Sequence, residues 1–254
     1  MSLLSAEGLV KDFGGLRAID DLSVSVDEGE LVGVMGPNGA GKSTFFNCVS
    51  GVIRPDEGTV ALDGTDVTGD PPESLAHRGL VRTFQTTREL ETMTVRDNVR
   101  LAAPDQPGER TLPALLRSGA MQDHEERVRE RADSLIEAFE LDHLADEYSS
   151  NLSGGQRKLL ELARTLMLDP DVLMLDEPFA GVNPTLTREI ADRIRDLNAD
   201  GMTVVIIEHE LETLTELVDR LVVLQQGRLL VEGDPEAVLS DERVIEAYLG
   251  GDAE

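Results

Sequence analysis

The sequence predicts an α/β fold, in which a parallel sheet covered by helices is interrupted by a helical insertion. Short apolar runs occur near both ends of the chain, whereas residues from about 87 to 165 lack β-branched runs and are rich in Leu, Ala, Arg and Glu. After residue 165, apolar runs alternate with helical stretches such as 186–198. Strand, helix and strand at that spacing favour a parallel sheet.

The elements follow from the same patterns, taken in chain order. We expect strands at 22–26, 31–35, 59–62, 172–176, 203–207 and 221–224, with Gly-Glu and Asp-Gly pairs as turns in the first part of the chain. A helix should follow the strand at 31–35. Residues 104–120 contain three Pro and two Gly, which favours a loop or a broken helix.

Composition limits the possible partners. The 254 residues include 23 Lys and Arg against 50 Asp and Glu, which gives a formal net charge of −27 and excludes nucleic-acid backbone binding as a main activity. Only three of the basic residues are lysines: Lys11, Lys42 and Lys158. Acidic, Lys-poor surfaces keep proteins soluble in concentrated salt, so we expect a high-salt cytoplasm; an ordinary acidic cytosolic protein is the alternative.

Cysteine content and apolar runs give two further expectations. Cys48 is the single cysteine, so no internal disulfide can form, and a small buried side chain is a better interpretation than a reactive thiol. The longest apolar runs, such as 204–207, are far shorter than the ~20 residues of a membrane span. Any membrane role must therefore come through a partner.

The segment GPNGAGKST follows the strand at 31–35 and leads into a helix. The spacing G-x-x-x-x-G-K-S in this context predicts a loop whose backbone N–H groups surround a phosphate, with Lys42 reaching the β- and γ-phosphates and Ser43 ligating Mg²⁺. The candidate nucleotide-binding residues of this loop are Gly36, Pro37, Asn38, Gly39, Ala40, Gly41, Lys42, Ser43 and Thr44.

The apolar strand at 172–176 ends in two carboxylates, Asp176 and Glu177. Ligands collect at the carboxyl ends of strands in open α/β sheets, so Asp176 is a candidate Mg²⁺ ligand. Glu177 would then be available to activate a water molecule as general base.

A second glycine-containing segment, LSGGQ, precedes an amphipathic helix and offers backbone donors at its N-terminus. Ser153 could also be a simple N-cap. The candidate binding residues here are Ser153, Gly154, Gly155 and Gln156. Along the chain the phosphate loop comes first, LSGGQ second and the Asp176 strand third. With these three motifs in this order, the chain resembles the nucleotide-binding subunit of ATP-binding cassette (ABC) transporters, in which LSGGQ is the family signature. The resemblance covers essentially the whole chain.

The resemblance implies a P-loop NTPase core of the ABC ATPase type, with an antiparallel β subdomain and an inserted α-helical subdomain. It implies one ABC ATPase domain over 1–254, with 1–86 and 166–240 as catalytic core, 87–165 as the helical subdomain with the signature, and 241–254 as a tail. Three more residues match family positions: Phe13 would stack on adenine, Gln85 would ligate Mg²⁺ and sense the γ-phosphate, and His209 would contact the γ-phosphate.

Finer features resemble one branch of the family. Many members have an Asp-ending SALD segment after the second carboxylate, whereas this chain has FAGVN with Asn183 in place of the acid. In this segment the chain is similar to the larger ATPase subunit of branched-chain amino acid importers. Three other segments point to the same subunit: FGGLRAID, VRTFQTTRELETMTVRDNV and VIEAYLG. ATPases for urea or amide import and for lipopolysaccharide extraction share these features and are alternatives.

The resemblance also implies partners. The transport system would contain two transmembrane permease subunits, with this chain at the cytoplasmic face of the membrane. This chain would form a head-to-tail dimer with a second ABC ATPase or with a copy of itself. A solute-binding protein would take part indirectly. ATP would lie between Lys42 of one subunit and Ser153 of the other. A soluble ABC ATPase without membrane partner is a less favoured alternative, and a simple GTPase or kinase would leave LSGGQ and His209 unexplained.

Overall fold

The structure is a computed structural model that describes residues 2–83, 90–104, 119–208 and 211–249. The chain forms two compact units. The strand-rich unit comprises Met1–Gln85, Pro170–Ala180 and Pro184–Glu254, and the helical unit comprises Thr86–Asp169 and Gly181–Asn183.

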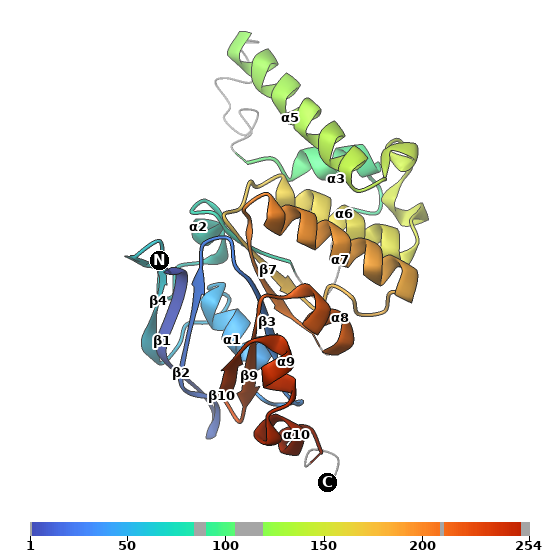
Figure 1. The fold of residues 1–254 in the computed structure, drawn as a ribbon. Helices are drawn as coiled ribbons and strands as arrows, with labels where there is room; N and C mark the ends of the chain where they lie inside the picture. Colours follow the sequence, from blue (N-terminus) through green and yellow to red (C-terminus); the bar gives the residue numbers. More distant parts are fainter. Residues whose placement is uncertain (1, 84–89, 105–118, 209–210, 250–254) are drawn as a thin grey trace. The chain divides into compact units, whose positions relative to one another are not determined.

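The strand-rich unit contains two sheets (Figure 1). The first has the order β2-β1-β4-β5, and its neighbouring strands are antiparallel: β1 Ser2–Phe13, β2 Leu16–Asp27, β4 Glu57–Leu62 and β5 Thr65–Asp66. The second has the order β10-β9-β3-β8-β7-β6: β3 Leu31–Met35, β6 Leu80–Arg82, β7 Val172–Asp176, β8 Thr203–Ile207, β9 Arg220–Gln225 and β10 Arg228–Gly233. It is parallel except for the β9–β10 pair.

Burial explains these strands. Every residue of β3, β7 and β8 is buried, which is why their sequences are continuous apolar runs, as expected for parallel strands covered on both faces. In β2, buried Leu22, Val24 and Val26 alternate with exposed residues, because one face of this sheet packs on the core. All six expected strands are confirmed.

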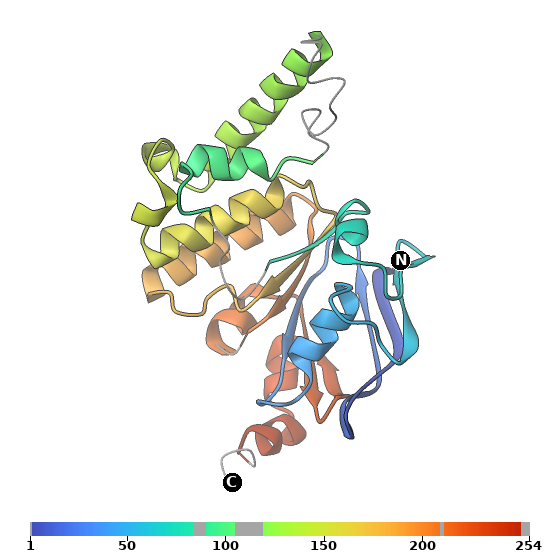
Figure 2. The same ribbon diagram turned by 180° about the vertical axis from the view of Figure 1, so that it is seen from behind.

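Helices cover the six-stranded sheet. Helix α1, Lys42–Val49, lies between the two sheets, and its Phe45, Phe46 and Cys48 join a core formed by residues of both (Figures 1 and 2). The expected helix after the strand at 31–35 is therefore confirmed. Cys48 is 1% exposed, and burial raises the pKa of its thiol to about 11, so it is a structural side chain as expected. The other helices of this unit are α2 Pro72–Ala76, α7 Pro184–Ala199, α8 Leu211–Leu217, α9 Pro235–Leu239 and α10 Glu242–Leu249.

The helical unit is built from α3 Val95–Leu101, α5 Gly119–Ala138 and α6 Gly154–Leu166, which pack on one another. Asn98 of α3 is fully buried and organises the segment before it: its side-chain amide accepts from the Leu90 N–H and donates to the carbonyls of Leu90, Met93 and Thr94. Most of the expected loop at 104–120 lies outside the described residues.

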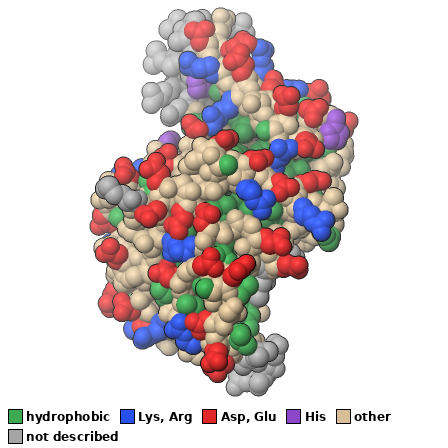
Figure 3. Space-filling view, viewed as in Figure 1, with side chains coloured by type: hydrophobic (Ala, Val, Ile, Leu, Met, Phe, Trp, Pro, Cys, Tyr) green, Lys and Arg blue, Asp and Glu red, His purple; other side chains and the backbone are tan. Residues whose placement is uncertain are grey.

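Two surface properties complete the description. Figure 3 shows Asp and Glu side chains spread over the face in view, with fewer Lys and Arg among them, in keeping with the net charge of −27. Within the described ranges, no helix has the length and apolar character needed to cross a bilayer.

Candidate nucleotide-binding site

Three neighbouring parallel strands end at the same edge of the six-stranded sheet. Val34 of β3 pairs with Ile207 of β8, and Ile207 pairs in turn with Asp176 of β7. The phosphate loop follows β3 and Glu177 follows β7, so the register alone brings these two candidate segments to one edge. His209 follows β8, but it lies outside the described residues, as does Gln85.

The phosphate loop is held by close backbone packing. A Cβ at Gly36 would lie 2.2 Å from the Leu224 carbonyl oxygen, and one at Gly41 would lie 2.6 Å from the Ala18 carbonyl oxygen. The Gly227 N–H donates to the Ala40 carbonyl at 2.9 Å. The loop therefore needs glycine where it meets β2 and the β9–β10 hairpin.

Lys42 begins α1 and points back into the loop. Its side chain is 6% exposed, and Nζ donates to the carbonyls of Gly36 at 2.6 Å and Pro37 at 3.2 Å. Burial lowers the pKa of Lys42, while the nearby charge of Glu177 acts against that shift. Among the described residues its hydrogen-bond partners are neutral loop carbonyls, so a buried ammonium is already placed to meet an anion.

The other loop residues fit a nucleotide with bound Mg²⁺. Asn38, Gly39 and Ser43 are exposed, so backbone donors and a hydroxyl are accessible at the start of α1. Oxygen ligands such as the Ser43 hydroxyl and the Asp176 carboxylate suit Mg²⁺. Within the described ranges no three His, Cys, Asp or Glu side chains form a metal cage.

Asp176 is buried and ion-paired. It is 6% exposed, its carboxylate accepts from Arg82 of β6 at 2.8 Å, and its N–H donates to the Thr83 hydroxyl at 3.3 Å. Sequence analysis did not identify Arg82, because Arg82 and Asp176 are 94 positions apart and a lone Arg in a short apolar strand is typical of a surface cation.

Glu177 turns the chain sharply at the end of β7. Its φ of 50° is left-handed, and its N–H donates to the Ile207 carbonyl at 2.9 Å. The following segment is fixed by Glu208, which is 2% exposed and accepts from the Phe179 N–H at 2.8 Å. Sequence reasoning also missed Glu208. A buried carboxylate thus holds the turn that carries the candidate general base.

Phe13 lies at the tip of the β1–β2 hairpin, paired with Leu16 across the turn. Its side chain is 47% exposed, so the ring is available for stacking. The Lys11 ammonium lies 5.6 Å from the ring centroid, within the range of a cation–π contact.

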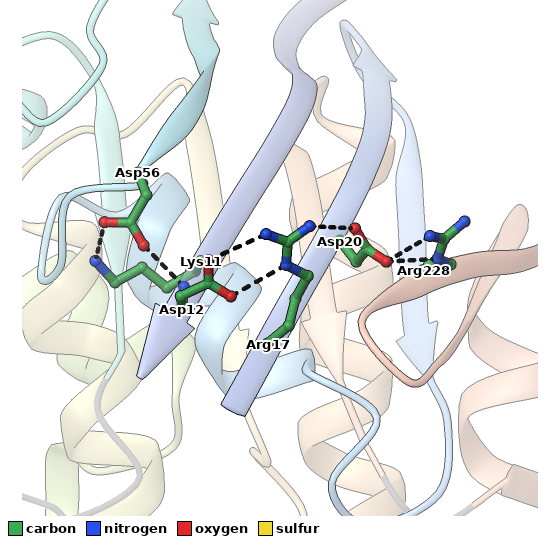
Figure 4. Close-up of polar contacts among 6 residues, drawn as sticks. All are labelled: Lys11, Asp12, Arg17, Asp20, Asp56 and Arg228. Atoms are coloured by element: carbon green, nitrogen blue, oxygen red, sulfur yellow. Dashed lines mark hydrogen bonds and ion pairs between the residues drawn. The ribbon is translucent and has the colours of Figure 1, made fainter. Parts of the chain in front are cut away.

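A chain of ion pairs and hydrogen bonds crosses the base of this tip (Figure 4). Its members alternate in charge along most of the chain and come from β1, β2, the segment before β4, and β10: Lys11, Asp12, Arg17, Asp20, Asp56 and Arg228. The Asp12 N–H and the Lys11 ammonium hold the pKa of Asp56 below its usual range. These contacts tie the Phe13 hairpin to its neighbours and so orient the candidate adenine platform.

The LSGGQ segment caps α6 in the helical unit. Ser153 Oγ accepts from the Gln156 N–H at 3.3 Å, and Gln156 Oε1 accepts from the Ser153 N–H at 2.9 Å, which is a capping box. Ser153 and Gly154 are exposed, whereas Gly155 and Gln156 are half-buried. The N-cap interpretation of Ser153 is therefore correct, and its exposure leaves it accessible to a second subunit.

A residue of the C-terminal helix also reaches the loop. Burial raises the pKa of Tyr248 in α10, and the Gly36 backbone acts against that shift. The side chain of Tyr248 is half-buried and lies near the first residue of the phosphate loop, a placement that the sequence did not predict.

Comparison with known proteins places the chain in a family. A family model described as ABC transporter matches residues 19–180, and one described as branched-chain amino acid ATP-binding cassette transporter matches 228–254. The probable branched-chain amino acid transport ATP-binding protein LivG of Archaeoglobus fulgidus is 42% identical over 250 residues, covering 98% of this chain and 96% of the relative.

Two solved structures are similar over most of their length. The ADP conformation of MJ1267, an ATP-binding cassette of an ABC transporter, aligns with a TM-score of 0.86 and 41% identity, covering 98% of this chain and 99% of that one. A dimeric post-hydrolysis state of the cassette MJ0796, bound to ADP and Pi, aligns with a TM-score of 0.73 and 26% identity, covering 91% and 98%.

These matches include the phosphate loop and the strand end at Asp176 and Glu177. They confirm the predicted ABC ATPase fold, and ATP is the nucleotide that such a fold binds. The chain therefore belongs to the ABC transporter family, as one of its ATP-binding subunits.

Proposed function

We propose that this chain hydrolyses ATP to power the import of branched-chain amino acids through separate membrane permease subunits. The observation that carries the ATPase assignment is the sheet edge at which the phosphate loop and the Asp176–Glu177 carboxylates meet. The substrate class is supported by the printed function of the LivG relative and by the family model over residues 228–254.

The residues divide the chemistry among them. The loop N–H groups and Lys42 would bind the phosphates, and Phe13 would stack on the adenine. Ser43, Asp176 and Gln85 would hold Mg²⁺, which when bound neutralises charge on the phosphates. Glu177 would accept a proton from the attacking water. His209 would orient that water beside the γ-phosphate.

A second subunit would complete the site. We assign the Ser153, Gly154, Gly155 and Gln156 segment to the ATP held by the phosphate loop of a partner, in a head-to-tail pair with two-fold symmetry. The dimeric form of the MJ0796 cassette supports this arrangement. Two chains that each carry a net charge of −27 repel one another, so salt should favour formation of this dimer.

The proposal includes the surrounding system. We propose that 1–86 and 166–240 form the catalytic core, 87–165 the helical subdomain, and 241–254 a tail. The dimer, formed with a second ABC ATPase or with another copy of this chain, would bind two permease subunits at the cytoplasmic face of the membrane. Mg²⁺ would be the metal bound with ATP. A solute-binding protein would deliver the amino acid to the permease.

A single substitution tests the catalytic assignment. Glu177→Gln keeps the shape of the side chain and removes its basicity, so we expect an ATP-bound dimer with negligible ATP turnover, measured by phosphate release and light scattering in high salt. Glu189→Gln, at an exposed position on α7, is the matched control and should behave as wild type. Full turnover in the Glu177 variant would refute the role of Glu177.

A separate experiment tests the transport assignment. The Glu177→Gln variant is affinity-purified from native membranes in high salt with ATP, and the proteins bound to it are identified by mass spectrometry. We expect two permease chains, a second cassette and an amino-acid-binding protein. Recovery of an ATP-dependent dimer without any integral membrane protein would support the ATPase assignment and contradict the transport assignment.

A further inference from the structure

We infer that Arg82 is a positioning residue that neutralises Asp176 until the nucleotide arrives with its metal, so that Mg²⁺–ATP binding replaces an ion pair already present in the chain. The inference rests on the proposed role of Asp176 as a Mg²⁺ ligand. It adds a residue that neither the phosphate loop nor the signature segment contains.

The ion pair is shielded from water. Nη2 of Arg82 donates to Oδ2 of Asp176 at 2.8 Å, and the two side chains are 9% and 7% exposed. Arg82 is the only cation paired with Asp176 among the residues that the structure describes. A buried carboxylate without a counter-charge is strongly unfavourable, so something must balance Asp176 whenever no metal is bound.

Arg82 is held from the other side by α1, the helix that Lys42 begins. Its Nη1 donates to Asn47 Oδ1 at 2.7 Å and to Ser50 Oγ at 2.9 Å, and its guanidinium lies 5.5 Å from the centroid of the Phe46 ring. Ser50 uses its own proton for the Phe46 carbonyl, at 2.6 Å, and so accepts from Arg82.

One nitrogen of the guanidinium remains without a partner. Nε of Arg82 is buried and makes no hydrogen bond to the described residues. The fork is thus fixed by α1 in an orientation that directs Nη2 to Asp176 and leaves Nε unsatisfied. The two bonds from Nη1 are enough to tie α1 to β6, whereas the bond from Nη2 to the Asp176 carboxylate is the one that balances its charge.

The consequence is selectivity for Mg²⁺ that is already bound to the nucleotide over free Mg²⁺. Because Arg82 already balances Asp176, a free divalent cation gains little at this carboxylate. A cation that arrives with the phosphates also gains the Ser43 hydroxyl and the nucleotide itself. Arg82 therefore raises the metal concentration that the site requires. In a chain of net charge −27, which attracts cations generally, this keeps Asp176 available for the metal–nucleotide complex.

The test uses thermal unfolding of the full chain rather than turnover. The unfolding midpoint is followed against Mg²⁺ concentration, with ATP present and ionic strength held constant with KCl, for wild type, Arg82→Gln and Arg82→Lys. Without metal, Arg82→Gln should unfold at a lower temperature than wild type. With ATP, the Mg²⁺ concentration for half of the stabilisation should fall by about tenfold, because the competing charge is gone. Arg82→Lys keeps the charge and should stay near the wild-type concentration.

Controls separate the possible failures. Arg78→Gln removes a more exposed cation of the same unit, 3.9 Å from Asp70, and should leave the Mg²⁺ requirement unchanged. An unchanged or higher requirement in Arg82→Gln would overturn the inference and leave the metal site standing. Failure of wild type itself to respond to Mg²⁺ with ATP would instead refute the proposed metal site.

A double variant covers the case in which Arg82→Gln does not fold. Arg82→Gln combined with Asp176→Asn removes both charges, so it should fold and be more stable than Arg82→Gln alone, because no uncompensated buried carboxylate is left. A double variant that is no more stable than Arg82→Gln, measured from unfolding without nucleotide, would show that the two side chains do not act as a pair and would overturn the inference.

Discussion

Two glycines of the phosphate loop, two residues apart, offer a matched test of how the loop is built. Both have positive φ, 77° at Gly39 and 103° at Gly41. A Cβ at Gly41 would lie 2.6 Å from the Ala18 carbonyl oxygen and 3.0 Å from Ile19 Cδ1, whereas a Cβ at Gly39 would meet no heavy atom within 4 Å. The alanine variants therefore share backbone strain and differ in steric overlap.

The magnitudes follow from that difference. A left-handed backbone is about 1–2 kcal/mol less favourable for an L-residue, so Gly39→Ala should lower the free energy of unfolding by that amount. Gly41→Ala adds overpacking against backbone that cannot easily move, about 1–3 kcal/mol more, for a total of roughly 2–5 kcal/mol.

The assay is urea unfolding of the two variants and wild type at one fixed KCl concentration without nucleotide. The slope against urea should stay constant, so that midpoints report stability alone. Equal losses in the two variants, or a smaller loss for Gly41→Ala, would refute the reasoning that the loop needs glycine at Gly41 because of its contact with β2.

Three other predictions concern caps, acid and salt. Ser153→Ala removes half of the capping box of α6 and should lower the free energy of unfolding by about 0.5–2 kcal/mol; an unchanged urea midpoint would contradict this. Burial alone would raise the pKa of Glu30, but bonds from Arg220 and the Asp27 N–H outweigh it and hold the pKa below its usual value. Since a lowered folded-state pKa gives stability that is present above the unfolded pKa, of about 4.3, and is lost as pH falls through the folded value, Glu30→Gln should be less stable than wild type near neutrality. That difference should vanish on acidification, and a pH-independent difference measured by unfolding would argue against it. Finally, the unfolding temperature should rise as KCl is raised from about 0.1 to about 2 M, because salt screens repulsion within a chain of net charge −27; a constant midpoint would contradict adaptation to high salt.

Elements buried on both faces were the easiest to predict from the sequence. The bounds of β3, β7 and β8 match the expected 31–35, 172–176 and 203–207, because every residue in them is buried and polar turns follow. The β1–β2 hairpin was only partly predicted. Its strands are 12 residues each, and irregular pairing between Ala6 and Asp12 breaks the alternation by which a strand is recognised.

Parts of the site were predictable for a different reason. The phosphate loop and the Asp176–Glu177 pair are local in sequence, so spacing alone identifies them. Arg82 bonds to Asp176, 94 positions away, and Glu208 bonds to Phe179, 29 positions away. No local sequence pattern marks such contacts. The predictions for Gln85 and His209 lie outside the described residues and remain predictions.

The burial of Cys48 makes this chain convenient for site-directed labelling. The only native thiol is enclosed by the core and has a raised pKa, so a thiol reagent at neutral pH should leave it unmodified. Cysteines introduced at the exposed positions of Asn38 and Ser153 would then be the reactive ones, without any need to remove the natural residue. Cross-linking or spin-label distances between such copies would measure head-to-tail pairing directly, in the otherwise unaltered protein.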